Sequence, residues 1–171
     1  MPLYNGGTGM KTAAMILILT VATLCGAVSS LRLKKRVDQL DALERDLTRT
    51  SSEIRFFRNP FGETLFRFEP ESRLLREMAA LPANSPESAY RAAKKKIGAS
   101  QCLTESDWKI LDRFFREEGA GNYEAEISCF SAAATALDQN KKEARNRWER
   151  YGRLYAAGGL MVGLFAVILL L

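Results

Sequence analysis

At 171 residues the chain has room for one domain of ordinary size, and its composition excludes several classes of function. It contains no histidine, which removes the commonest general base and the commonest metal ligand. Its three cysteines show no C-x-x-C spacing, so they favour free thiols in a reducing compartment over a zinc site or a disulfide framework. The net charge of +5 lies in basic patches at residues 32–36 and 141–153, while the region between them is net acidic. A nucleic-acid-binding protein would carry its excess charge on the body, so nucleic acid is not an expected partner.

The first segment, NGGTGMKT at residues 5–12, looks like a phosphate-binding loop. Such a loop needs G-x-x-x-x-G-K-[ST], but here Met10 separates Gly9 from Lys11, and no strand precedes the segment. We therefore interpret residues 1–11 as a polar tail outside the cytoplasm, and we expect no nucleotide or other cofactor.

Two long apolar segments occupy the ends of the chain. Residues 12–31 are twenty uncharged residues, about 30 Å of helix and enough to cross the hydrocarbon core of a bilayer. Residues 154–171 are 18 uncharged residues and are also long enough to cross. Both basic patches lie on the inner sides of these segments, so the positive-inside rule places residues 32–153 in the cytoplasm. The sequence thus predicts a two-pass integral protein of the cell membrane, with both termini outside.

Small residues recur on one face of each apolar segment. Ala22, Gly26 and Ser30 are spaced every four positions in the first segment, and Gly159 and Gly163 form a G-x-x-x-G pair in the second. Small faces let helix backbones approach closely in lipid. We expect these segments to pack on each other or on partner subunits; the alternative is that small residues are simply common in membrane helices.

A cleaved signal peptide is the alternative interpretation of the first segment. Lys11 would be its charged region, and the mature chain would begin near Val28, after the small residues of Cys25-Gly26-Ala27. The apolar run is longer than a usual signal core, however, and RLKKR follows it at once and resists export. These features favour an uncleaved anchor.

The region between the anchors has helical periodicity. Apolar residues at steps of three and four form one seam near each anchor. The first seam contains Leu33, Val37, Leu40, Leu47 and Ile54, with Glu44 and Ser51 filling two positions. The second contains Ile127, Phe130, Ala134, Leu137, Ala144, Trp148, Tyr151 and Tyr155, and only Lys141 interrupts its apolar character. We expect each seam to form one continuous helix with its membrane segment, and the two helices to pack as an antiparallel stalk.

Shorter helices are predicted between the two seams from their start and stop residues. One begins at Asn59-Pro60 and ends at Glu69-Pro70, and a second covers residues 71–81. A third begins at Ser85-Pro86 and ends at Gly98. A fourth begins at Thr104, which forms a capping box with Asp107, and ends at Gly119; Asn122 then caps the last long helix. The predicted fold is therefore all-α, a helical bundle on a two-helix stalk between two transmembrane helices.

No arrangement of residues indicates an enzyme. Glu117, Glu118, Glu124 and Glu126 cluster around a predicted turn, where carboxylates favour a helix N-terminus electrostatically and need no catalytic role. Neither a nucleophile with a base nor a metal cluster is apparent. The run Lys94-Lys95-Lys96 suits a solvated helix face, with a dock for an acidic partner or anionic lipid as the alternative. We expect Trp108, Phe114 and Phe115 to lie in the core.

The C-terminal part of the chain resembles the stage III sporulation protein AB family. The resemblance is carried by LTESDWKILDRFFREEGAGNYEAEI from Leu103 and by the closing YGRLYAAGGLMVGLFAVILLL. That close resembles the family's G-L-x-x-G-L-x-x-x-I-L-L-L run, here Gly159-Leu160, Gly163-Leu164 and residues 168–171. The family has the same layout, with an N-terminal membrane anchor, a helical body and an apolar C-terminus.

The resemblance implies a role in endospore formation, as a subunit of the channel complex that links mother cell and forespore. The family is similar to the inner-membrane platform proteins of type II secretion and type IV pilus machines. Such proteins present a helical cytoplasmic domain to a secretion-type ATPase, here one like stage III sporulation protein AA, and contact other channel subunits. The membrane would be that of the mother cell around the forespore. Candidate docking residues are Arg91, Lys94, Lys95 and Lys96, together with Glu117, Glu118, Gly119 and Asn122 of the predicted turn.

Two other functions fit the same residues. One is a membrane-tethered coiled-coil scaffold that has no ATPase partner. The seams would also suit pairing between chains, in a homo-oligomer. The other is an exported protein with a cleaved first segment and a C-terminal anchor.

Overall fold

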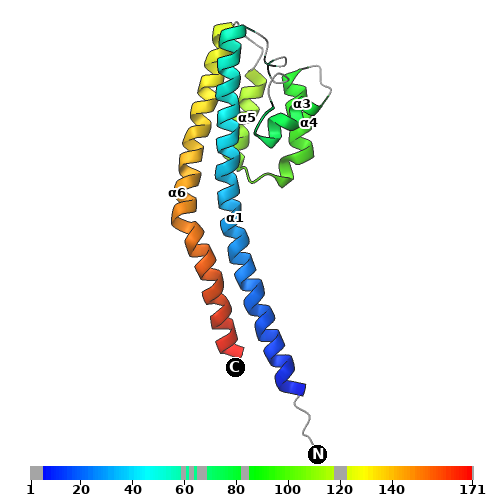
Figure 1. Cartoon of the computed structure of the whole chain (residues 1–171), viewed down its shortest axis with the longest axis vertical. Coiled ribbons are helices and arrows are strands. Elements are labelled where there is room, and N and C mark those ends of the chain that lie inside the picture. The colour runs from blue at the N-terminus through cyan, green and yellow to red at the C-terminus, as the bar shows by residue number, and fades with distance from the viewer. Residues whose placement is uncertain are drawn as a thin grey trace, which may run out of the picture. The chain divides into compact units, whose positions relative to one another are not determined.

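The computed structural model describes residues 6–58, 61, 64, 69–81, 85–117 and 123–170. Every regular element among these residues is helical, as predicted (Figure 1). The elements are α1 (Gly6–Phe57), α3 (Arg73–Ala80), α4 (Pro86–Ile97), the 3-10 helix η1 (Gly98–Ser100), α5 (Glu105–Glu117) and α6 (Tyr123–Leu170). The predicted helix between residues 60 and 69 falls mostly outside the described residues, and so does the predicted turn at 118–122.

The predicted continuity of the two long helices is confirmed. α1 includes both the first apolar segment and the first seam, and α6 includes both the second seam and the last apolar segment. By tertiary contacts the chain divides into two compact units. The body comprises Lys35–Ala144, and the anchor unit comprises Met1–Lys34 with Arg145–Leu171.

α4 begins at the predicted Ser85-Pro86, whereas α3 begins at Arg73, two residues after the predicted start of its helix at residue 71. The Ser72 hydroxyl caps α3 by accepting the Leu75 N–H. Ser85 and Ser88 form a reciprocal capping box at the start of α4, with Pro86 as its first residue. These contacts satisfy backbone N–H groups that have no partner within the helix. Local sequence therefore determines where α3 and α4 begin.

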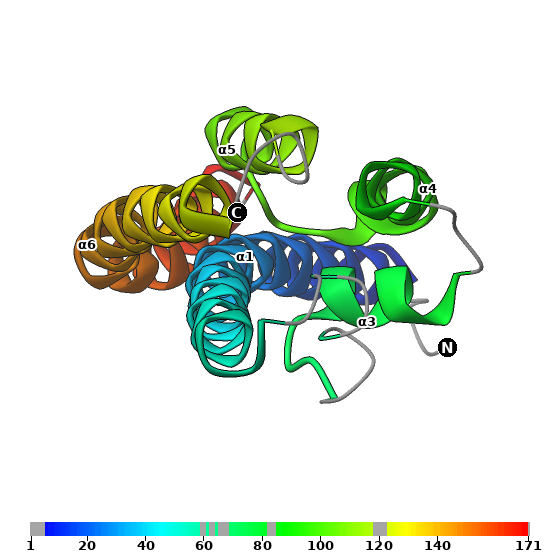
Figure 2. The ribbon, with the colours of Figure 1, turned by 90° about the horizontal axis from the view of Figure 1, so that it is seen from above.

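The body is built on antiparallel portions of α1 and α6. α5 lies against both of them and α3 lies beside α1, while α4 contacts α3 and α5 (Figure 2). Val37, Leu40, Leu47 and Ile54 of the predicted seam are buried. The buried face of α1 is broader than the seam, since Leu43, Asp46 and Thr50 are also buried. It is broader because three helices, α3, α5 and α6, pack on α1.

Lys141, the polar interruption of the second seam, has carboxylate partners on the opposite helix. Its ammonium lies 3.3 Å from Asp41 and 3.1 Å from Glu44, both on α1, and 3.2 Å from Asp138 on its own helix. Partial burial by itself would lower the pKa of Lys141, but hydrogen bonds to these carboxylates outweigh burial and raise it. The polar positions of the two seams thus meet each other rather than apolar side chains.

Aromatic rings fill the centre of the body. Phe61, Phe114, Phe115 and Phe130 are all at most 2% exposed. Phe114 contacts Phe130 of α6 edge-on at 4.8 Å between ring centroids, and Phe115 stacks on Tyr90 of α4 at 4.4 Å. Burying each phenyl ring contributes about 2 kcal/mol, and each well-placed ring pair about 1 kcal/mol more. The expected core positions of Phe114 and Phe115 are confirmed, whereas Trp108 is partly exposed.

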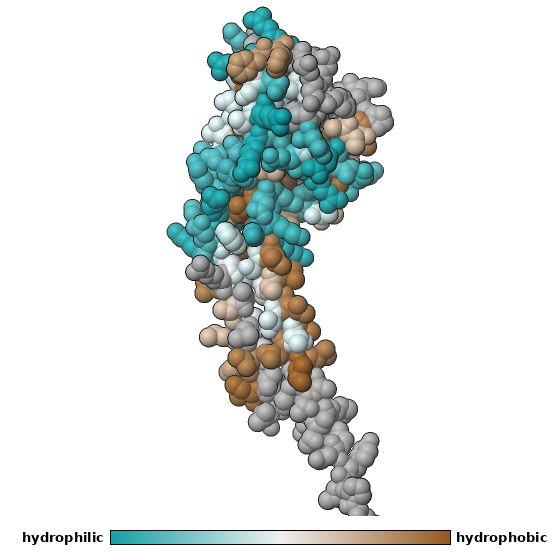
Figure 3. Space-filling model, in the orientation of Figure 1, coloured by the Kyte–Doolittle hydropathy of each residue, from teal (hydrophilic) through white to brown (hydrophobic). Residues whose placement is uncertain are grey.

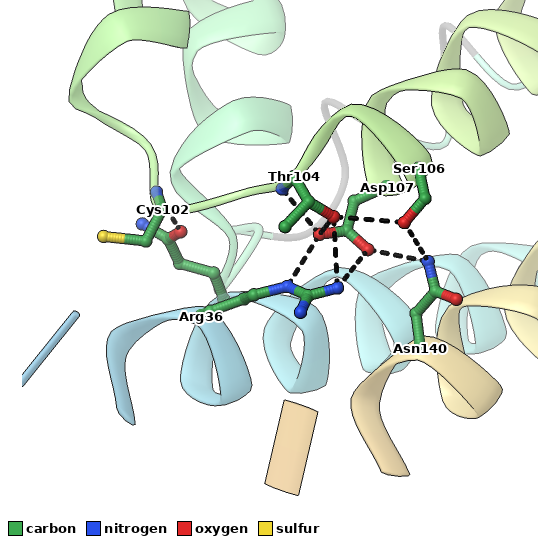
Figure 4. Close-up of polar contacts among 7 residues, drawn as sticks. Arg36, Cys102, Thr104, Ser106, Asp107 and Asn140 are labelled. Atoms are coloured by element: carbon green, nitrogen blue, oxygen red, sulfur yellow. Dashed lines mark hydrogen bonds and ion pairs between the residues drawn. The ribbon is translucent and has the colours of Figure 1, made fainter. Parts of the chain in front are cut away.

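A buried ion pair joins α5 to both long helices (Figure 4). Arg36 of α1 donates through Nε and Nη2 to the two carboxylate oxygens of Asp107, at 2.9 and 3.0 Å. Asn140 of α6 donates to Asp107 at 2.7 Å, and Thr104 donates to it from both its backbone N–H and its hydroxyl at 2.8 Å. The predicted contact of Thr104 with Asp107 is present, but Asp107 also binds two other helices. Arg36 therefore has a structural role inside the body in addition to its place in a basic patch.

A second buried carboxylate holds the start of α3. Asp46 of α1 accepts the backbone N–H groups of Glu71 at 3.0 Å and Ser72 at 2.8 Å, and it is 3% exposed. Ser72 is the residue that caps α3. The first turn of α3 is thus attached to α1 through one side chain.

The anchor unit buries backbone rather than side chains between its helices. A Cβ atom added at Gly26 would collide with the Tyr155 carbonyl oxygen and lie 3.2 Å from the Gly159 Cα. One added at Gly159 would lie 2.7 Å from the Ala22 carbonyl oxygen, and one at Gly163 would lie 2.8 Å from a Leu19 methyl carbon. The small residues thus face each other within one chain at a separation that side chains would prevent.

Apolar side chains cover the outside of the anchor unit (Figure 3). Leu17 and Met161, for example, are 65% and 71% exposed. Among the described residues, one helix is long and apolar enough to cross a membrane, over Ile16–Phe57 within α1. Several side chains of the second apolar segment lie outside the described set, and that second span stays a prediction.

Substituting Gly26 or Gly159 by isoleucine should force the helices of the anchor unit apart. We expect each substitution to lower the stability of the detergent-solubilised chain by about 1–3 kcal/mol, because the new side chain meets backbone that cannot move away. Thermal unfolding followed by circular dichroism measures the effect. Gly158→Ile is the matched control, since a Cβ there has nothing within 4 Å. Equal losses at all three positions would contradict the close packing.

Replacing Asp107 by asparagine should leave the buried Arg36 guanidinium without a counter-charge. We expect a loss of about 3 kcal/mol in the free energy of unfolding. Glu105→Gln on the same helix is the control and should change stability by less than about 0.5 kcal/mol, because Glu105 lies on the surface. A loss for Asp107→Asn no larger than that of the control would show that the pair does not hold the body together.

The same pair predicts a pH dependence. Burial by itself would raise the pKa of Asp107, but hydrogen bonds from Arg36 and Thr104 outweigh burial and lower it. The pKa of Asp107 is thus lower in the folded state than in the unfolded state, where it is about 4. The ion pair therefore contributes its full stabilisation above about pH 4, and this stabilisation is lost as the pH falls through the folded-state pKa of Asp107. Between pH 7 and pH 3, therefore, the wild type should lose more stability than Asp107→Asn. Parallel pH profiles would argue against an ionised Asp107.

Replacing Asp46 by alanine should loosen α3 locally. Two backbone N–H groups would lose their buried acceptor, at a cost of about 1–3 kcal/mol. Hydrogen exchange of residues 71–75 should accelerate, while exchange in α5 stays slow. Asp38→Ala on the exposed side of α1 should leave both rates unchanged.

Candidate functional site

No metal-binding cluster occurs in the part of the chain that the structure describes. Within it, no group of three or more cysteine, aspartate or glutamate side chains could hold a metal ion. The two most buried carboxylates, Asp46 and Asp107, are both saturated with structural hydrogen bonds. The surface of the body therefore offers the better candidates for function.

The candidate site is a groove between α4 and α5, with a volume of about 410 Å³. Because α4 presents residues three and four positions apart on one face, several of its charged side chains enter the same groove. Its lining comes from Glu87, Tyr90, Arg91, Lys94 and Lys95 of α4 and from Asp112 and Arg116 of α5. Four of these side chains are cationic and two are anionic, so the groove has a net positive charge.

The least exposed side chains of the lining, Tyr90, Lys94 and Asp112, form the floor of the groove. Asp112 accepts a hydrogen bond from the Tyr90 hydroxyl at 2.6 Å, and its two carboxylate oxygens accept from the Lys94 ammonium at 2.6 and 2.8 Å. Lys94 also lies 5.1 Å from the centre of the Trp108 ring, within reach of a cation–π interaction. These contacts fix α4 against α5 and hold the floor in one arrangement.

The pKa shifts of the floor follow from these contacts. Burial, then the hydrogen bond to Asp112, raises the pKa of Tyr90, so the phenol stays protonated and donates. Partial burial would raise the pKa of Asp112, but hydrogen bonds from Lys94 and Tyr90 outweigh burial and lower it. Asp112 is therefore an anion at neutral pH, and it neutralises Lys94.

The other lining side chains, those of Glu87, Arg91, Lys95 and Arg116, form the rim of the groove and are more exposed than the floor. Arg91 pairs with Glu87 at 2.6 Å one helical turn away, and both side chains are exposed to solvent. Lys95 and Arg116 are exposed and form no ion pair or hydrogen bond with any described residue. Two cations on two different helices are thus available to a ligand.

The structure brings some of the predicted docking residues together and separates others. Arg91, Lys94 and Lys95 line the groove. Lys96 instead pairs with Glu77 of α3 at 2.6 Å, and Glu117 pairs with Arg113 at 3.0 Å. Three further predicted residues lie outside the described residues, namely Glu118, Gly119 and Asn122.

Sequence reasoning missed the contribution of α5 to this site. Asp112 and Arg116 are four positions apart and share a helix face, which the sequence shows. Nothing local, however, indicates that this face meets the basic face of α4. The role of Tyr90 could have been suspected only from its place one turn before Lys94.

Comparison with known proteins agrees with the architecture. The sequence model of the stage III sporulation protein AB family matches residues 11–171, nearly the whole chain. The chain belongs to this family. Membership supports a role in sporulation, and the resemblance seen in the C-terminal sequence is confirmed. A search of curated proteins found no significant match.

A solved structure named stage III sporulation protein AB (SpoIIIAB) has the same fold as much of this chain. The TM-score is 0.58 at 19% sequence identity, over 67% of this chain and 96% of the other. At that identity the match supports the fold of this family member and not the roles of individual residues.

Proposed function

We propose that this protein is a non-enzymatic platform subunit of the channel complex between mother cell and forespore. In this role it anchors in the membrane through both apolar segments and docks a secretion-type ATPase through its cytoplasmic helical body. Membership of the stage III sporulation protein AB family supports the sporulation role. The groove between α4 and α5, with its net positive charge and its exposed Lys95 and Arg116, is the observation that supports docking.

The anchor unit supports the membrane part of the proposal. Within residues 16–31 and from residue 154 onward, most of its exposed side chains are apolar, as lipid-facing side chains must be, and its helices approach at glycines. Basic residues follow the first apolar segment and precede the second, which favours a cytoplasmic body under the positive-inside rule. The mother-cell membrane around the forespore is the location that the family suggests.

A platform needs a rigid surface and not a catalytic centre. The body joins its helices through buried ion pairs and aromatic contacts, so a force applied to α4 or α5 passes to α1 and α6. Such a body can transmit the motion of an ATPase without chemistry of its own. Other subunits of the stage III sporulation channel are the expected further partners.

A membrane-tethered scaffold without an ATPase is the second candidate. The long antiparallel pair of α1 and α6 favours it, because paired helices of this kind also organise assemblies, including homo-oligomers. An exported protein with a cleaved first segment is a further alternative. The side of the membrane on which the body lies separates it from the other two.

The first experiment determines that side. Ala99→Cys places one thiol at an exposed position of the body, with the three native cysteines replaced. Intact and permeabilised cells are then treated with a membrane-impermeant maleimide, and a cysteine-free chain serves as the control. We expect labelling only after permeabilisation. Labelling of intact cells would place the body outside and exclude ATPase docking.

The second experiment tests the partner. The full chain, solubilised in detergent, should copurify with the sporulation ATPase of the same cell. Deleting α4 and α5 is unsuitable because the core would be lost, so the surface variants described below are used. Recovery of structural partners without the ATPase would favour the scaffold.

A further inference from the structure

The cationic side chains of the α4–α5 groove differ in whether they form ion pairs. The Lys94 charge is balanced by Asp112 on the floor, and that of Arg91 is shared with Glu87. Lys95 and Arg116 also line the groove and form no ion pair or hydrogen bond with a described residue, although the charge of Arg116 acts on Asp112. With four cations and two anions in its lining, the groove has a net positive charge, and Lys95 and Arg116 are exposed to a ligand.

The two cations are placed by rigid elements. Tyr90 stacks on the buried ring of Phe115 at 4.4 Å and donates to Asp112, so the helices that carry Lys95 and Arg116 are joined directly to each other. A ligand that bridges both cations would therefore not have to order the two helices first. Preorganisation of this kind lowers the free-energy cost of binding.

We propose that this groove binds an acidic segment of a partner protein, with carboxylates of the partner paired to Lys95 and Arg116. Arg91 and Lys95 are four positions apart on α4, so their side chains lie one helical turn apart. Carboxylates spaced by one turn on a partner helix would match that spacing. The identification of this partner with the ATPase rests on the proposed function, whereas the binding site itself does not.

The shape and charges of the groove favour a protein segment over a lipid surface. Glu87 and Asp112 line the groove together with the cations, and they would repel a continuous anionic surface. A concave site of about 410 Å³ also suits a few protruding side chains better than a flat bilayer. A segment with separated carboxylates can reach Lys95 and Arg116 and avoid the two anions.

The test uses a defined peptide, so the partner need not be known. The probe is a fluorescein-labelled helical peptide with glutamates at every fourth position, and the control peptide carries glutamines there. Fluorescence anisotropy measures the binding of each peptide to the full chain in nanodiscs of zwitterionic lipid. We expect the glutamate peptide to bind measurably and the glutamine peptide to bind at least about tenfold more weakly.

Charge reversal then locates the site. Lys95→Glu with Arg116→Glu should weaken binding at least about tenfold, because attraction becomes repulsion. Lys109→Glu with Lys142→Glu makes the same change in net charge at exposed positions outside the groove and should change binding by less than about twofold. Lys95→Gln with Arg116→Gln should give an intermediate loss. Because all four side chains lie on the surface, each variant should keep its wild-type circular dichroism.

Several results would overturn the proposal. Equal weakening by the two reversal variants would mean that net charge alone attracts the peptide. Equal binding of the glutamine peptide would exclude carboxylate recognition. Cosedimentation of the nanodiscs with phosphatidylglycerol vesicles through Lys95 and Arg116, without peptide binding, would make lipid the ligand.

Copurification separates this site from the proposed function. If the groove reversal abolishes both peptide binding and ATPase copurification, both proposals are supported. If peptide binding is lost and the ATPase is still recovered, the acidic-segment site stands and the ATPase docks elsewhere. If the ATPase is never recovered while the peptide binds normally, the proposed function is contradicted, whereas the acidic-segment site is still supported.

Discussion

The body of this protein depends on one buried ion pair, between Arg36 of α1 and Asp107 of α5. Removing two charges from water costs several kcal/mol per ion, and a buried pair is tolerated only when its geometry and remaining hydrogen bonds are good. Here the guanidinium binds both carboxylate oxygens, and Asn140 and Thr104 occupy the other acceptor sites (Figure 4). Lysine could not replace Arg36, because an ammonium lacks the planar pair of donors that matches a carboxylate.

The position of α5 determines what the rest of the body can form. Once α5 is held against α1 and α6, Phe114 meets Phe130 and Phe115 meets Tyr90, so the aromatic core closes. The contact with Tyr90 places α4, and the groove exists only because α4 and α5 lie together. A buried polar contact on one side of α5 thus supports a charged surface on the other. This arrangement suits a platform, since a docking surface transmits force only if it cannot move independently.

The two units of the chain rely on different physical interactions. In the body, buried carboxylates bind arginine, asparagine and backbone N–H groups from other elements. In the anchor unit, the helices approach through Gly26 and Gly159 at a distance that excludes side chains. Apolar side chains gain little from burial between helices when lipid surrounds them, so close backbone contact is the effective source of attraction. Each unit therefore uses the interaction that its proposed surroundings leave available.

The sequence by itself determined the helical class, the two long helices, the start of α4 and the small residues of the anchor unit. These features depend on periodicity and capping within a few residues, where local physical rules are strong. It also singled out Arg91, Lys94, Lys95 and Lys96 as candidate docking residues. The tertiary structure alone decided that Arg36 is buried, that Asp107 binds Arg36 and Asn140 besides capping α5, and that Lys96 turns to Glu77. Periodicity shows which residues share a helix face, but it does not show which face of another helix they meet. For that reason the contribution of Asp112 and Arg116 to the groove became visible only when α4 and α5 were seen side by side.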